Sequence, residues 1–150
     1  RVAAMVNTLV QDYKSDDAST TLLEFKSGAQ ATVDCFYCIP DAASRTRLEV
    51  YGSQGAALTE GTIGQSVGGV LESLQSADAA GYDAPQSKDV ARKFQKVPFP
   101  KINPYTAECS YFADCILQGR PPALNDGRNA TMIAELTDKA YRSYKQRKMV

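Results

Sequence analysis

The four cysteines are the residues of this chain with the most obvious chemical potential. Cys35 and Cys38 have the CxxC spacing of redox dithiols and zinc sites, whereas Cys109 and Cys115 lie six residues apart. The first pair falls on a predicted strand, where a separation of three places the side chains on opposite faces. The second falls on a predicted helix, where six residues turn through about 600°. We therefore predict buried free thiols, no metal site and a reducing, cytoplasmic location, with a thiol or metal enzyme at Cys35 and Cys38 as an alternative.

The chain contains no histidine, and its ten glycines form no nucleotide-binding motif. Imidazole is the side chain that most readily transfers protons near neutral pH, and it is a frequent zinc ligand. Neither GxxxxGK[ST] nor GxGxxG occurs, which argues against a phosphate loop and against a dinucleotide turn. The sequence thus predicts no catalytic residue, no cofactor-binding residue and no bound cofactor within these 150 residues.

Polar side chains in predicted loops could still hydrogen-bond a hydroxylated small molecule. Asp41 and Arg45 lie in the Ile39–Thr46 loop, and Tyr82 lies in a glycine-rich irregular segment between Gly61 and Lys88. Asn103 and Tyr105 lie at the start of a predicted helix, where helix capping and core packing are the alternative explanation. The candidate substrate-binding residues are Asp41, Arg45, Tyr82, Asn103 and Tyr105.

These candidates must be positioned by a predicted antiparallel sheet that dominates the first half of the chain. β-branched and apolar runs separated by Gly, Pro and Asp-rich turns predict three consecutive strands of one sheet, at Thr20–Phe25, Ala29–Cys38 and Arg45–Tyr51. Gly28 suits the tight reversal between the first two strands. Further strands are predicted at Val2–Tyr13 (with helix as the alternative), Ala56–Thr59, Gly69–Leu74 and, at an edge, Val90–Phe99.

The predicted sheet is apolar on both faces. Val33, Cys35 and Tyr37 point to one side, and Phe36 and Cys38 point to the other. If helices cover only one side, the second face carries exposed apolar area of the kind that forms an interface with another domain or subunit. The alternative is a second layer built from the remaining segments of this chain.

Two helices are predicted to follow the strands. The first is capped by Asn103, continues with Pro104 and ends at Gly119, and the second runs from Asn125-Asp126 to about Arg147. They are long enough to cover one sheet face, so the fold class is α+β, with an open, mainly antiparallel sheet. The predicted buried residues are Tyr105, Cys109, Phe112, Ala113 and Ile116 in the first helix, and Ala130, Ile133, Ala134, Thr137, Tyr141 and Tyr144 in the second.

Overall composition predicts a single globular domain over residues 1–150. The chain is 43% hydrophobic and 23% charged, with a formal net charge of +0. These values exclude a disordered or fibrous chain, and the lack of a basic stripe makes nucleic acid an unexpected partner. No apolar run approaches the roughly 20 residues of a membrane span. Because the sequence starts at Arg1 without an initiator methionine, we expect it to be a piece of a longer polypeptide.

The order of these elements resembles a known family. The segments LLEFKSGAQATV, RLEVYGSQGAAL, NPYTAECSYFADCILQGRPP and AYRSYKQRK are similar to the C-terminal domain of the glucose–fructose oxidoreductase, inositol dehydrogenase and MocA family. The resemblance implies a two-domain oxidoreductase whose N-terminal Rossmann domain, absent here, binds NAD or NADP. It also implies a sugar, cyclitol or related hydroxy compound as substrate, and a homo-oligomer formed through the open sheet face.

The family's catalytic motifs cannot be placed on this sequence. The glycine-rich dinucleotide turn and the Glu-Lys-Pro motif of the family are missing, and there is no histidine to match the catalytic one. The resemblance therefore implies a substrate-binding and oligomerisation domain that is inactive alone. A non-enzymatic binding or scaffold module that associates through its sheet is the alternative.

Overall fold

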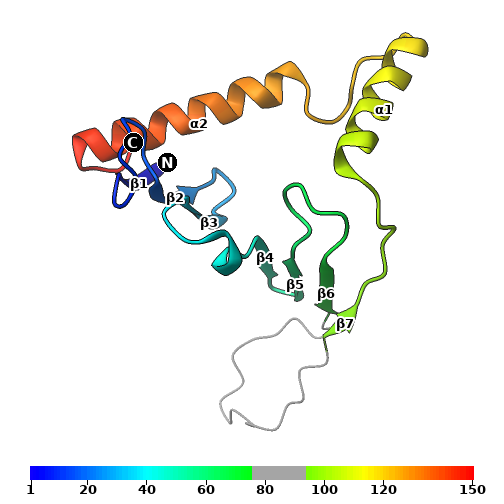
Figure 1. Ribbon diagram of the computed structural model, residues 1–150, viewed down its shortest axis with the longest axis horizontal. Helices are drawn as coiled ribbons and strands as arrows, with labels where there is room; N and C mark the ends of the chain where they lie inside the picture. The colour runs from blue at the N-terminus through cyan, green and yellow to red at the C-terminus, as the bar shows by residue number, and fades with distance from the viewer. Residues whose placement is uncertain (76–93) are drawn as a thin grey trace, which may run out of the picture. The chain divides into compact units, whose positions relative to one another are not determined.

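A computed structural model describes residues 1–75 and 94–150 of the chain as strands and two long helices (Figure 1). The chain divides into two compact units, residues 1–44 with 122–150 and residues 45–121. The first unit contains β1 (Val2–Asn7), β2 (Ala18–Glu24), β3 (Gln30–Phe36), the short 3-10 helix η1 (Asp41–Ala43) and α2 (Gly127–Gln146). The second contains β4 (Arg47–Gly52), β5 (Gly55–Glu60), β6 (Val70–Gln75), β7 (Gln95–Lys96) and α1 (Pro104–Leu117).

The first unit is an antiparallel sheet in the order β1-β2-β3. The predicted turn between β2 and β3 is confirmed, because Phe25 N–H donates to Ala29 O at 2.9 Å and Gly28 adopts a φ of 89°. A side chain disfavours this positive φ, which explains glycine at the reversal. Strand β1, which the sequence favoured over a helix, pairs along β2 with Val2 opposite Leu23.

Helix α2 packs on β1, on the side of the sheet that carries Val2 and Val6 (Figure 1). Val2 and Val6 are buried on that face, and Ser143 is the buried residue of the helix. The Ser143 hydroxyl accepts a hydrogen bond from Ala4 N–H at 3.1 Å and donates one to Lys148 O at 2.7 Å. The backbone of Val150 exchanges two further bonds with Val2, of 2.7 and 2.9 Å. These contacts tie the end of the chain to β1.

The predicted buried side of α2 is wrong for five of its six residues, and only Tyr144 is partly buried. Ile133, Thr137 and Tyr141 are exposed, whereas Leu136 and Ser143 lie closer to the sheet. The bonds of Ser143 to β1 and to Lys148 O require the helix to turn its face at Ser143 toward β1. Ile133 lies on a different side of the helix. The Tyr141 side chain is exposed, and its hydroxyl donates a hydrogen bond to Asp16 in the loop between β1 and β2.

The opposite face of the first sheet carries exposed large apolar side chains. Alternation along the strands places Met5, Leu22 and Phe36 on the side away from Val2 and Val6. Met5 is 62% exposed and Leu22 is 49% exposed. The predicted fold class is therefore confirmed: the structure is α+β with open antiparallel sheets.

The second unit contains a separate antiparallel sheet in the order β4-β5-β6-β7. The prediction that Arg45–Tyr51 joins the earlier strands in one sheet is wrong. Pro40 and η1 interrupt the chain after β3, and β4 then pairs with β5 across the turn between Gly52 and Gly55. The strand predicted at Gly69–Leu74 is confirmed as β6. Of the strand predicted at Val90–Phe99, only Gln95–Lys96 form a strand, β7, within the described residues 94–99, and residues 90–93 lie outside the described residues.

Helix α1 begins and ends where the sequence predicts, but its apolar stripe is not buried by the described residues. Phe112 is 57% exposed and Ile116 is 65% exposed, whereas Cys115, outside the stripe, is buried.

The predicted burial of the thiols is confirmed for Cys115 and wrong for Cys35 and Cys109, which are exposed. All four cysteines are free thiols. Neither a metal-binding cluster nor a helix able to cross a membrane occurs among residues 1–75 and 94–150.

Candidate functional site

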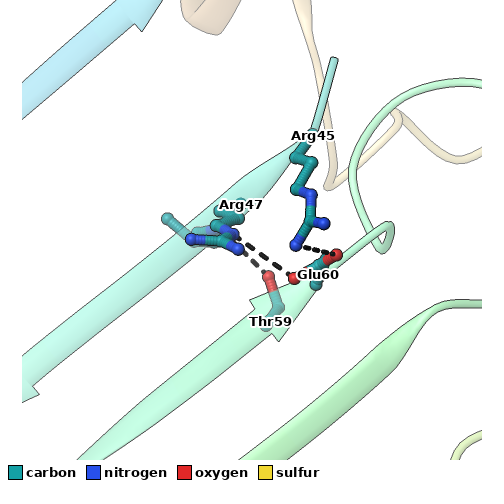
Figure 2. A network of polar contacts seen from close by, with 5 residues as sticks. Arg45, Arg47, Thr59 and Glu60 are labelled. Carbon is teal, nitrogen blue, oxygen red and sulfur yellow. Dashed lines mark hydrogen bonds and ion pairs between the residues drawn. The ribbon is translucent and has the colours of Figure 1, made fainter. Parts of the chain in front are cut away.

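Two arginines and one glutamate gather where β4 begins and β5 ends (Figure 2). Arg47 and Glu60 are direct partners in the β4–β5 ladder, so their side chains lie on the same face of the sheet. Arg47 Nε lies 3.3 Å from Glu60 Oε2, and Arg45 Nη1 lies 3.7 Å from Glu60 Oε1. All three side chains are about half exposed or more, so a solvent molecule or ligand can reach the cluster.

The backbone under this cluster is closely constrained. Leu48 N–H donates to the Thr59 hydroxyl at 3.2 Å, and Gly61 N–H donates to Thr46 O at 2.9 Å. Gly69, with a φ of 118°, passes so close to Gly61 that a Cβ on Gly69 would lie 2.6 Å from the Gly61 carbonyl oxygen. These contacts join the start of β4, the end of β5 and the approach to β6, and they fix the strand positions from which the charged side chains project.

The cluster is suited to recognition of a polar group. A guanidinium carries five N–H donors and stays charged at any pH of interest, whereas Glu60 contacts one nitrogen of each arginine. Both contacts are longer than the 2.7–2.9 Å typical of a tight charge-assisted hydrogen bond. Donors therefore remain for an anion or for hydroxyl oxygens. Arg45, a predicted site residue, lies in this cluster.

Asn103 and Tyr105 lie together at the start of α1, where the structure assigns a structural role to the first of them. Asn103 Oδ1 accepts hydrogen bonds from the backbone N–H groups of Tyr105 at 3.0 Å and Thr106 at 3.2 Å. The capping alternative for Asn103 is thus confirmed. The Tyr105 side chain is exposed, so the prediction that it contacts a ligand stays a prediction, and its packing into a core is wrong for the described residues.

Asp41 has no described contact with the arginine cluster. Asp41 is the first residue of η1, where its carbonyl accepts from Ser44 N–H at 3.0 Å, and it belongs to the first unit whereas Arg45 opens the second. Tyr82 lies outside the described residues. A hollow of about 250 Å³ in the first unit is lined by Leu23, Phe25, Leu136 and Lys139, among others, and by none of the predicted site residues.

Sequence reasoning missed the two other members of the cluster, Arg47 and Glu60. The Arg45-Thr46-Arg47 spacing was a usable signal, because residues two apart on a strand point to the same side. Glu60 carried a weaker signal, since the predicted strand at Ala56–Thr59 ended one residue too early to include it. Its position opposite Arg47 depends on the strand register, which follows from the turn between Gly52 and Gly55.

A second charged group missed by the sequence reasoning is the buried carboxylate of Asp17 in the first unit, which is 2% exposed. Its oxygens accept hydrogen bonds from the backbone N–H groups of Leu9 at 2.7 Å, Val10 at 2.8 Å and Gln11 at 2.8 Å. These bonds, that of Gln11 foremost, lower the pKa of Asp17 below its ordinary 3.8 against the opposing effect of burial. Asp17 therefore organises the loop between β1 and β2 and is not available for acid–base chemistry.

Comparisons with known proteins agree with the predicted resemblance. Residues 1–58 match the family model described as the GFO/IDH/MocA C-terminal domain, which confirms the resemblance over that part of the chain. No curated protein sequence matches.

Among solved structures, the chain is similar to an aldose-aldose oxidoreductase from Caulobacter crescentus complexed with glycerol, at 21% identity and a TM-score of 0.76 over 99% of this chain. It is also similar to an oxidoreductase from Agrobacterium radiobacter in complex with NAD+, L-tartaric acid and magnesium, at 17% identity and a TM-score of 0.66 over 96% of this chain. At these identities the likeness is one of fold, and the chain spans 40% of the length of each protein.

Proposed function

We propose that this chain is the substrate-binding and oligomerisation domain of an NAD(P)-dependent oxidoreductase that acts on a sugar, a cyclitol or a related hydroxy compound. The match of residues 1–58 to the GFO/IDH/MocA C-terminal domain is the observation that carries the proposal. The fold likeness to two oxidoreductases, one of them an aldose-aldose oxidoreductase, supports it. The exposed free thiols of Cys35 and Cys109 suit a reducing compartment, and we propose a cytoplasmic location for the same reason.

The requirements of hydride transfer determine which steps we assign to this chain and which to another domain. The reaction needs a bound nicotinamide and a group that exchanges the hydroxyl proton of the substrate. We assign both to a Rossmann domain in a longer polypeptide, because this chain spans 40% of the length of the solved oxidoreductases. Residues of this chain would then orient the substrate. Arg45, Asp41 and Tyr105 are the described candidates, Asn103 is already engaged as a helix cap, and Tyr82 remains a prediction.

Cofactor binding is the first test of this proposal. In isothermal titration calorimetry, the intact polypeptide is expected to bind NAD(H) or NADP(H) with one site per chain, and a fragment limited to residues 1–150 is expected to bind neither. A screen of sugars and cyclitols with the intact polypeptide then identifies the substrate by reduction of the cofactor. Failure of the intact polypeptide to bind either dinucleotide would replace this proposal by the non-enzymatic scaffold module.

We propose further that the chain forms a homo-oligomer through the open face that carries Met5, Leu22 and Phe36. Apolar side chains on an exposed sheet face support such an interface, which would bury on the order of 1,600 Å² if it is stable. Leu22→Lys is expected to convert the oligomer to monomers in sedimentation velocity at high micromolar concentration. Leu117→Lys, an equally drastic change of an exposed leucine on α1, is the matched control and should leave the sedimentation coefficient unchanged. A monomeric unmodified protein would contradict the proposal.

A further inference from the structure

We infer that Arg45 and Arg47 form a recognition site for the carboxylate of a sugar acid, and that Glu60 holds the place of this carboxylate in the free protein. The inference rests on the proposed function for the sugar part of the ligand and on the geometry for its carboxylate. In Figure 2, Arg45 faces one oxygen of Glu60 and Arg47 faces the other, with separations of 3.7 and 3.3 Å. The two arginines therefore address both oxygens of a single carboxylate.

The pairing of β4 with β5 does not explain the presence of two arginines. Arg47 is the direct ladder partner of Glu60, and one such cross-strand pair of opposite charge is sufficient to favour the register. Arg45 precedes β4 and has no ladder partner in the described β4–β5 pairing, yet it approaches the same carboxylate. Exposed ion pairs of this kind add little to stability. The second guanidinium is thus better explained by binding than by folding.

The charge of the cluster favours an additional anion. Two guanidinium groups face one carboxylate in the cluster. The next carboxylate on the same face of β4, that of Glu49, accepts a hydrogen bond from the Tyr51 hydroxyl and has no described ion pair with either arginine. Both contacts to Glu60 are long and solvent-exposed, so exchange of Glu60 for a ligand carboxylate sacrifices little. A planar carboxylate could then take paired N–H donors from either guanidinium, with shorter bonds than Glu60 makes. Neutral sugars lack this charge and would bind the cluster weakly.

The test compares two sugars that differ at a single group. D-glucuronate and D-glucose share a pyranose ring, and the first carries a carboxylate where the second carries a hydroxymethyl group. In the intact polypeptide without cofactor, nitrogen NMR signals of the arginine side chains and of the Gly61 amide report binding. We expect saturable shifts with D-glucuronate and none with D-glucose. Arg45→Gln and Arg47→Gln are each expected to raise the dissociation constant about tenfold, whereas Glu60→Gln lowers it severalfold by removing the competing carboxylate.

Arg142→Gln is the matched control, because Arg142 is an exposed arginine that pairs with Asp138 at 3.0 Å on α2. It should bind D-glucuronate as the unmodified protein does. Equal shifts with both sugars, or full affinity in Arg45→Gln and Arg47→Gln, would overturn the inference. Tighter binding of inorganic phosphate than of D-glucuronate would overturn the carboxylate assignment, and unchanged affinity in Glu60→Gln would overturn the displacement of Glu60. The calorimetric assay for dinucleotides separates these outcomes from failure of the proposed function, since it reports on a different domain.

Discussion

Gly55→Ala is expected to separate β5 from β6 and to destabilise the second unit by about 3 kcal/mol or more. Gly55 lies directly opposite Gln75 in the β5–β6 ladder. A Cβ on Gly55 would lie 2.1 Å from the carbonyl oxygen of Leu74 and 3.2 Å from the Cα of Gln75. Both neighbours are backbone atoms of the paired strand, so no side chain can rotate away and the strands themselves must move. Urea unfolding followed by circular dichroism, with hydrogen exchange of the β6 amides, measures the loss.

Gly28→Ala is the control that isolates the effect of crowding. Gly28 also has a positive φ, of 89°, but a Cβ there would meet no atom within 4 Å. Its substitution should cost only the backbone penalty of about 1–2 kcal/mol for an alanine in the left-handed region. If Gly55→Ala were no more destabilising than Gly28→Ala, the close approach of β5 to Leu74 would have no energetic importance.

Asp17→Asn is expected to lower the melting temperature by about 5 °C, because at least one backbone N–H group loses its acceptor. In the native protein, Asp17 Oδ1 accepts from Leu9, and Oδ2 accepts from Val10 and Gln11. An asparagine has only one acceptor oxygen, so its NH₂ group must face the N–H of Leu9 or those of Val10 and Gln11. Differential scanning calorimetry measures the change. Asp12→Asn, in the same loop but exposed, should leave the melting temperature unaltered.

The same carboxylate predicts a dependence of stability on pH. Because the fold lowers the pKa of Asp17 below 3.8, the unfolded chain binds a proton more readily than the folded chain does. The stabilisation is therefore complete above the unfolded pKa and is lost as the pH falls through the lower, folded pKa. Between pH 6 and pH 3, Asp17→Asn should show a shallower decline in melting temperature than the native protein. Parallel declines would show that Asp17 does not carry the predicted protonation linkage.

Local features of this fold follow from short stretches of sequence. The turn at Gly28, the cap at Asn103 and the helix start at Asp126 each depend on residues within three positions along the chain. Such features are predictable because glycine tolerates positive φ, and because Asn and Asp oxygens accept the first free N–H groups of a helix. The same reasoning gives the α+β class, since runs of strands precede runs of helices.

Features that depend on distant residues were not predictable in this way. The alternating pattern of Arg45–Tyr51 predicts a strand but does not show which strand it pairs with. Its place in a sheet separate from β1–β3 therefore follows only from the structure. The rotation of α2 is fixed by Ser143 and Ala4, which lie 139 residues apart. The candidate site has the same character. Arg45 could be found from its place in a loop, but its pairing with Glu60 depends on the register between β4 and β5.

The contacts of Val150 and Ser143 with β1 occupy backbone groups at the edge of the first sheet. An unpaired strand edge presents rows of N–H and C=O groups on which a foreign strand can add. On β1, both backbone groups of Val2 are occupied by Val150, and the Ala4 N–H is occupied by the Ser143 hydroxyl. A strand that added at this edge would have to displace Val150 from Val2 and the buried Ser143 hydroxyl from Ala4. These residues of β1 are therefore not available to pair with another strand.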